Sequence, residues 1–245
     1  SEYTAKKISL NYQFDINKID IIPRGVNCED FKTINFPNNE ILNLRKKWTK
    51  NNNQKIILLP ARYTRWKGHE LAIKALSELS KKNANLNFSI IFVGNKKGNE
   101  KYINHLEKLS NKLGISNYLR ILENFDNMPL AYLSSDIILY PSIVPEPFGR
   151  VSIEAQAAGK IIIASDDGGT KETIVDGINN SGFRFKSNNI DDLIDKIDFA
   201  LKLSDGEISN IAERARKNVS ENFSLENMCK KTLDVYDRIL NVSKK

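Results

Sequence analysis

Two carboxylates are separated by seven intervening residues in the stretch PEPFGRVSIE, beyond the middle of the chain. Glu146 lies between two prolines, which stiffen the backbone of its loop. Glu154 falls about one and a half turns into the helix that we expect next, so both carboxylates can reach one crevice. The N–H groups that open this helix form an anion site, and they belong to Phe148, Gly149 and Arg150. Isolated glutamates usually lie in solvent, and this remains the alternative.

A cationic loop, ARYTRWKG, follows the first strongly apolar run of the sequence. Arg62 offers a planar fork that suits two phosphate oxygens, whereas Lys67 is a compact point charge. Both residues leave the carboxyl end of one expected strand, so they can converge on a diphosphate without a metal ion. A basic surface loop would have the same composition, and that interpretation stays open.

Glycine-containing loops follow two other apolar runs. Gly168 and Gly169 permit a tight turn or the close approach of a ligand. The loop that begins at Gly94 matches no Walker or dinucleotide fingerprint. His69 and His105 have no second ligand at a metal-binding spacing, so we expect no metal site. The sequence also has no Gly-x-Ser-x-Gly elbow, and it gives no support to hydrolase chemistry.

Short apolar runs alternate with longer amphipathic ones, which predicts βαβ units and a doubly wound parallel α/β sheet. The expected strands are residues 55–59, 87–93, 119–122, 136–140 and 161–164. The expected helices are residues 68–82, 99–113, 128–133, 148–158, 190–203, 205–218 and 225–240. Ligands of such sheets bind at the carboxyl ends of the strands, where all of the loops described above fall.

The whole chain has 245 residues, 40% of them apolar and 27% charged, which is ordinary for a soluble globular protein. Its net charge of +7 favours anionic partners but names none. Two cysteines are too few for a disulfide scaffold, and no apolar run is long enough to span a membrane. We therefore expect a cytoplasmic protein. The first fifty residues differ from the rest: residues 19–23 are strand-like, and residues 35–50 have a weak helical pattern.

These motifs together resemble the C-terminal half of glycosyltransferase family 4, the retaining enzymes with the GT-B fold, whose halves are Rossmann-like. The most diagnostic block is residues 146–159, which is similar to Glu-Pro-Phe-Gly-Leu…Glu-Ala…Ala-x-Gly. The other matches lie in the expected order at residues 21–27, 61–68, 132–142 and 168–172.

The resemblance implies roles for the matched residues. Arg62 and Lys67 would bind the diphosphate of a nucleotide-sugar donor and stabilise the leaving nucleotide, with no cofactor. Glu154 would bind the ribose hydroxyls. Glu146 would act beside the amides of residues 148–150, holding the transferred sugar and the distal phosphate. The expected catalytic residues are thus Arg62, Lys67 and Glu146, and the expected substrate-binding residues are Glu154, Phe148, Gly149, Arg150, Val151 and Gly94.

The chain departs from the family pattern at a few positions. Arg150 replaces the usual leucine and Arg24 the usual asparagine, which would suit an acidic sugar or a phosphorylated acceptor. Residues 95–97 depart from the usual Gly-Asp-Gly, which puts the sugar-ring contacts there in doubt.

The resemblance also implies how the chain is organised. Residues 1–50 would be an interdomain hinge, residues 51–222 a nucleotide-sugar-binding domain, and residues 223–245 a helix that returns to an N-terminal domain. That domain would bind a glycan or lipid-linked acceptor, such as a lipopolysaccharide, at the inner face of the membrane. Without it, we expect this chain to bind its donor and to transfer little or nothing.

Three other functions remain open at this point. A nonenzymatic nucleotide or phosphate sensor on the same fold would tolerate the loss of Glu146. An epimerase of the GT-B type would not need this spacing of glutamates. A nucleic-acid-binding protein would need aromatic residues among its cations, and Trp66 beside Arg65 is the one hint, so we expect no nucleic acid partner.

Overall fold

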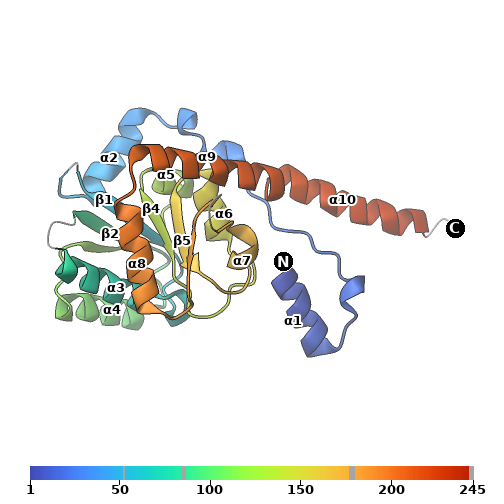
Figure 1. Cartoon of the computed structure of the whole chain (residues 1–245), viewed down its shortest axis with the longest axis horizontal. Helices are drawn as coiled ribbons and strands as arrows, with labels where there is room; N and C mark the ends of the chain where they lie inside the picture. The colour runs from blue at the N-terminus through green and yellow to red at the C-terminus, as the bar shows by residue number, and fades with distance from the viewer. Residues whose placement is uncertain (52, 84–86, 177–179, 243–245) are drawn as a thin grey trace.

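A six-stranded, wholly parallel sheet forms the centre of the protein (Figure 1). The structure is a computed structural model, and it describes residues 1–51, 53–83, 87–176 and 180–242. The strand order is β3-β2-β1-β4-β5-β6, so the chain fills one half of the sheet and then crosses back to fill the other. The strands are β1 (Lys55–Pro60), β2 (Phe88–Val93), β3 (Leu119–Leu122), β4 (Ile137–Tyr140), β5 (Ile161–Ser165) and β6 (Phe183–Phe185).

Helices cover both faces of the sheet (Figure 1). One face packs against α3 (His69–Lys82), α4 (Glu100–Lys112) and α8 (Ile190–Leu201). The other face packs against α2 (Asn38–Trp48), α5 (Met128–Leu133), α6 (Arg150–Ala157) and α9 (Asp205–Asn222). The remaining helices are α1 (Glu2–Tyr12), α7 (Thr170–Thr173) and α10 (Leu225–Val242).

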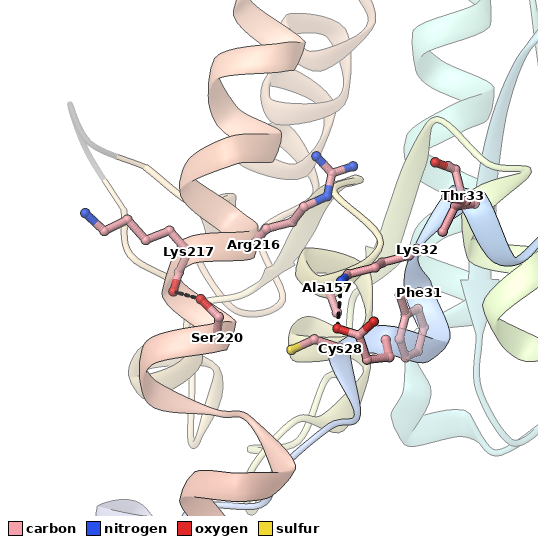
Figure 2. A pocket seen from close by; sticks show the side chains of 10 residues that line it. Cys28, Phe31, Lys32, Thr33, Ala157, Arg216, Lys217 and Ser220 are labelled. Atoms are coloured by element: carbon pink, nitrogen blue, oxygen red, sulfur yellow. Dashed lines mark hydrogen bonds and ion pairs between the residues drawn. The ribbon is translucent and has the colours of Figure 1, made fainter.

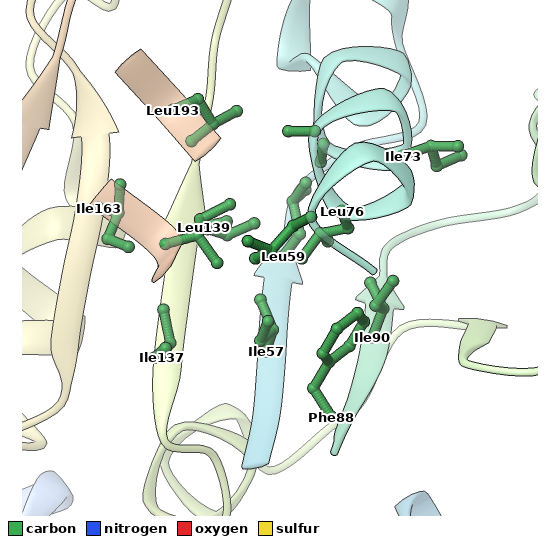
Figure 3. Packing of buried hydrophobic residues seen from close by; sticks show 14 of the residues in the cluster. Ile57, Leu59, Ile73, Leu76, Phe88, Ile90, Ile137, Leu139, Ile163 and Leu193 are labelled. Atoms are coloured by element: carbon green, nitrogen blue, oxygen red, sulfur yellow. The ribbon is translucent and has the colours of Figure 1, made fainter. Parts of the chain in front are cut away.

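The two cores follow from the alternation of side chains along each strand. Ile57 and Leu59 of β1 point into the core under α3, whereas Ile56 and Leu58 point into the core under α6. Figure 3 shows the first core, where Leu76 of α3 lies over the residues of β1 and its neighbours. A strand that is buried on both faces needs a continuous apolar run, which is why the inner strands are visible in the sequence.

The chain enters and leaves the sheet domain at one place. Val26 and Ser224 form an isolated parallel bridge, in which the Val26 N–H donates to the carbonyl of Phe223 at 2.9 Å and the Leu225 N–H donates to the carbonyl of Val26 at 3.0 Å. From this bridge α10 projects away from the sheet (Figure 1). None of the described helices is long and apolar enough to cross a membrane.

The expected doubly wound parallel fold is confirmed, and the differences are local. The strand-like residues 19–23 form no strand, because they run as an extended segment without a partner strand. The short edge strand β6 and the helices α1 and α7 were not expected. Residues 1–50, which the resemblance assigns to a hinge, also supply part of the core, since Leu44 and Trp48 are buried against the second face. Residues 243–245 of the expected C-terminal segment lie outside the described residues.

Candidate functional site: an anion crevice at the carboxyl edge of the sheet

The cationic loop and the loop after β4 cross closely at the carboxyl edge. Gly68 has a φ of +75°, and a Cβ there would lie 1.8 Å from the carbonyl oxygen of Pro141. Only glycine fits such a crossing without a shift of the backbone. The Ile143 N–H also donates to the carbonyl of Trp66 at 2.8 Å. The turn that carries Lys67 is therefore fixed against the loop that leads to Glu146.

Lys67 and Glu146 form a buried ion pair. The Lys67 Nζ lies 2.6 Å from the Glu146 Oε1, and their side chains are only 10% and 7% exposed. The hydroxyl of Ser142 donates to the same carboxylate oxygen. Burial lowers the pKa of Lys67, and the nearby Arg62 lowers it further, whereas the Glu146 carboxylate opposes this shift. The sequence placed both residues in one crevice, and the structure brings them into direct contact.

Two aromatic residues surround the Lys67 ammonium. Its Nζ lies 3.9 Å from the centre of the Trp66 ring and 5.1 Å from that of Tyr140. The Tyr140 hydroxyl is 3.5 Å from the same nitrogen, and burial together with the Glu146 charge raises the tyrosine pKa. The Arg62 guanidinium lies over the same Trp66 ring, with its Cζ 5.7 Å from the ring centre. The two predicted phosphate-binding cations therefore share one indole ring.

The Gly168–Gly169 pair holds the Glu146 loop in place. Glu146 and Gly168 form a parallel bridge, and the Gly169 N–H donates to the Glu146 carbonyl at 2.7 Å. A Cβ on Gly168 would lie 2.4 Å from the Glu146 carbonyl oxygen, and one on Gly169 would lie 2.4 Å from the Cα of Phe148. These glycines thus allow a close contact between two loops, which was neither of the two roles considered from the sequence.

Two side chains hold Glu154 of α6: one is Tyr132 of α5, and the other is Arg150 at the start of α6. The Tyr132 hydroxyl donates to Glu154 Oε2 at 2.8 Å, and Arg150 donates to Oε1 at 2.9 Å. Tyr132 is fully buried, and burial followed by the Glu154 charge raises its pKa well above the ordinary value. Each carboxylate oxygen thus keeps acceptor capacity for a ligand, since each has about two lone-pair sites.

Arg62 and Glu154 line the same cavity, of about 390 Å³. Gly94 and Val151, two further predicted substrate-binding residues, also line it. Its other walls come from the ends of β1 and β2, the segment before α5, and α5 itself: Pro60, Ala61, Val93, Asn95, Asn124, Phe125, Asp126, Met128 and Tyr132. The cavity thus combines apolar side chains, one arginine and two carboxylates, which is the composition of a small-molecule site.

Three predicted residues contribute mainly backbone. The Phe148 side chain packs in the core against Phe223, with ring centres 5.9 Å apart, which leaves only its backbone for a ligand. Gly149 precedes α6 with a φ of +92°, which favours glycine there. Gly94 is required by packing, because a Cβ there would lie 2.1 Å from the carbonyl oxygen of Ala61. The first N–H groups of an α-helix lack the usual acceptor four residues back and therefore suit an anion, and in α6 the Ser152 N–H already donates to the carbonyl of Gly149 at 3.0 Å.

Trp66, Tyr132, Ser142 and Tyr140 touch the predicted residues but were not predicted as site residues. Tyr132 lies in a block that carries the family resemblance, and Trp66 sits between the two predicted cations in sequence. Both signals were present, but an aromatic residue beside a strand is usually a core residue. The described residues contain no group of three His, Cys, Asp or Glu side chains that could hold a metal ion.

A larger cavity, of about 600 Å³, lies away from this crevice (Figure 2). It is formed by the segment before α2, the end of α6 and the last turns of α9, and it shares no lining residue with the first cavity. Lys32 is paired there with Glu29 at 2.7 Å, and Lys217 points away from Lys32 (Figure 2). Lys32 and Lys217 therefore do not converge, and Arg216, the third cation of this cavity, donates to the carbonyl of Ala158 at 3.4 Å.

The sequence model of the glycosyl transferases group 1 family matches residues 40–220. The chain belongs to this family. A crystal structure of a glycosyltransferase from Rickettsia africae ESF-5 is 37% identical, with a TM-score of 0.90 over 98% of this chain and 62% of that one. The lipopolysaccharide 1,2-N-acetylglucosaminetransferase of Salmonella typhimurium is 28% identical over 87% of this chain and 55% of its own length. Anabaena HepE in complex with UDP-glucose has the same fold, with a TM-score of 0.83, 23% identity, and coverage of 95% of this chain and 61% of that one.

The chain spans about half the length of the curated relatives it matches. Residues 40–220, which the family model matches, include the cationic loop, both glutamates and the glycine pair. The site described above therefore lies in a group 1 glycosyltransferase domain.

Proposed function

We propose that this chain is the donor-binding half of a retaining glycosyltransferase of family 4, a hexosyltransferase that takes a nucleotide-diphosphate sugar. The observation that carries the proposal is the joint placement of Arg62 and Glu154 in one cavity, beside the buried pair of Lys67 and Glu146. A nucleoside needs a concave site with a hydrogen-bond acceptor for its ribose hydroxyls, and a diphosphate needs cations beside its phosphates. Both are present at one edge of the sheet.

Each residue has a role in this proposal. Glu154 accepts hydrogen bonds from the ribose hydroxyls, and Arg62 and Lys67 bind the diphosphate. Their charge stabilises the nucleotide as it leaves, which is the largest contribution such a site can make to catalysis. Glu146, with the N–H groups of residues 148–150, binds the sugar and the distal phosphate. Two fixed cations supply the charge that a metal ion would otherwise supply, so we propose that no cofactor is required.

We propose that the acceptor binds to a second domain and is a lipid-linked or lipopolysaccharide glycan in the cytoplasm, at the inner face of the membrane. The similarity to the Salmonella lipopolysaccharide transferase supports this acceptor class. The bound UDP-glucose of HepE supports a nucleotide-sugar donor, with UDP, GDP and ADP as the bases to test. Without the second domain, this chain binds its donor and does not turn over.

Calorimetric titration of the chain with UDP, GDP and ADP in the presence of EDTA tests donor binding. We expect one of the three to bind, and Lys67→Gln to weaken it by about tenfold or more, as expected for a lost charge-assisted contact. Lys81→Gln is the matched control, because Lys81 is an exposed lysine on α3 that pairs only with Glu78 among the described residues. A folded chain that binds none of the three nucleotides contradicts the proposal.

The nonenzymatic sensor remains the second candidate, and Glu146 separates the two. In a donor site, Glu146→Gln weakens the nucleotide sugar more than the free nucleoside diphosphate, because Glu146 contacts the sugar. In a sensor, the two affinities change equally.

A further inference from the structure

Trp66 lies between the two cations of the crevice. The Lys67 ammonium is 3.9 Å from the centre of its ring, and the Arg62 guanidinium carbon is 5.7 Å from it. The tryptophan is half-buried in the short turn Arg65–Lys67, and its carbonyl accepts a hydrogen bond from Ile143. The ring is therefore fixed from the backbone side, and it faces both groups that the proposed donor would meet.

The surroundings of Lys67 show what the ring contributes. A buried ammonium has three N–H groups, and the described residues give it one strong acceptor, the Glu146 carboxylate at 2.6 Å. The Tyr140 hydroxyl, at 3.5 Å, is a weak second partner. A cation this close to an indole face is attracted by the negative charge of the ring, and the attraction grows when water is excluded. Trp66 thus compensates part of the cost of burying Lys67.

We propose that Trp66 is a positioning residue for diphosphate recognition: its ring holds the buried Lys67 and the exposed Arg62 next to each other, facing the place of the phosphates. This inference rests on the proposed function. Trp66 thus contributes to binding of the phosphates and not to binding of the nucleoside. Its ring is not among the residues that line the 390 Å³ cavity of Arg62 and Glu154, which we call the nucleoside cavity.

Tyr132 provides the matched comparison at the other end of the site. Its hydroxyl holds Glu154 at 2.8 Å, and Tyr132 itself lines the nucleoside cavity. Loss of this hydroxyl should weaken the nucleoside part of the ligand, whether or not phosphates are attached. The two aromatic residues therefore predict different patterns for a nucleoside and its diphosphate.

The experiment compares Trp66→Leu, Trp66→Phe and Tyr132→Phe with the unchanged chain. The probes are the nucleoside diphosphate that binds most tightly among UDP, GDP and ADP, and its free nucleoside, both titrated by NMR. We expect Trp66→Leu to weaken the diphosphate by about three- to thirtyfold and to leave the nucleoside within about twofold. Trp66→Phe keeps an aromatic face and recovers most of the loss. Tyr132→Phe weakens both ligands by the same factor.

Two results would overturn the inference. Equal weakening of both ligands by Trp66→Leu, with no rescue by phenylalanine, would mean that the ring only packs. An unchanged diphosphate affinity would mean that it does not act on the cations at all. Thermal unfolding of each variant shows that the chain is folded in the titrations. If the unchanged chain binds none of the three nucleotides, the proposed function itself is wrong, and that result is distinct from either of these.

Discussion

At the scale of single residues, the crevice contains a charge pair that is satisfied internally. Lys67 and Glu146 neutralise each other at 2.6 Å, with Ser142 as a further donor to the carboxylate. A buried pair of this kind returns little net stability, but removal of one partner leaves the other charge buried and uncompensated. The pair therefore holds both side chains in place at the carboxyl edge of the sheet.

This pairing gives a prediction for stability. Lys67→Met and Glu146→Gln should each lower the free energy of unfolding by about 3 kcal/mol, because each leaves a polar partner buried without its counterion. The double variant should cost clearly less than the two single costs added together, and the difference is the coupling energy of a double-mutant cycle. Urea unfolding of the four proteins measures it.

An exposed ion pair with a similar N–O distance is the control for that cycle. Lys81 and Glu78 lie 2.7 Å apart on the surface of α3, where solvent screens their attraction. The cycle of Lys81→Met and Glu78→Gln should give a coupling energy of at most about 0.5 kcal/mol. If the buried pair gives no larger value, the two charges do not depend on each other as the structure indicates.

Individual site residues were predictable where chemistry left a trace in the sequence. Arg62 and Lys67 flank a turn after an apolar run, and Glu146 and Glu154 bracket a helix start, so topology alone brings them to one edge. The contacts made by Trp66 were not predictable, because the direction of a ring depends on the fold of a short turn. The direct pairing of Lys67 with Glu146 depends in the same way on two loops that meet only in three dimensions.

At the scale of elements, the inner strands, the edge strand β3 and the covering helices were predictable, whereas the edge strand β6 and the helix α1 were not. β1, β2, β4 and β5 are apolar on both faces, so each appears as a short continuous run. The strand β6 has three residues, with a half-buried arginine at its centre. The helix α1 was missed because it buries only Ala5. Both elements depend on tertiary contacts that local sequence does not report.

The glycine pair allows a test of how one loop holds another. Gly168→Ala should disturb the Glu146 loop, because its φ of +61° is strained for alanine and the new Cβ would lie 2.4 Å from the Glu146 carbonyl oxygen. We expect a loss of about 2 kcal/mol or more in the free energy of unfolding and weaker binding of the nucleoside diphosphate. Chemical denaturation and calorimetry measure the two effects.

Gly206 is the matched control for this substitution. It lies in the first turn of α9, and a Cβ there would meet nothing within 4 Å. Gly206→Ala should leave nucleotide affinity unchanged and leave stability equal or slightly raised, since alanine is the better helix former. An equal effect of the two substitutions would show that the contact between Gly168 and Glu146 is not what holds the loop.

At the scale of the whole molecule, His69 connects the cationic loop and the start of α3 to the aromatic part of the first core. His69 is fully buried at the start of α3, directly after Gly68. Its ring lies 5.3 Å from that of Tyr63, 5.0 Å from that of Phe92 and 5.9 Å from that of Tyr102. The sequence offers His69 no second ligand for a metal ion, and the structure places its ring inside an aromatic cluster.

This placement predicts how stability depends on pH. Burial lowers the pKa of His69 from its ordinary value of 6.5 to about 4, so the ring stays neutral in the folded protein. Between these two values the unfolded chain binds a proton that the folded chain does not, and stability therefore falls as the pH falls. From pH 7.5 to 4.5 this one group should remove about 2 to 3 kcal/mol. His69→Leu fills the cluster without a titratable ring, so its loss over the same range should be smaller by that amount. Urea unfolding at both pH values measures the differences, and parallel pH curves for His69→Leu and the unchanged chain would contradict a neutral, buried His69.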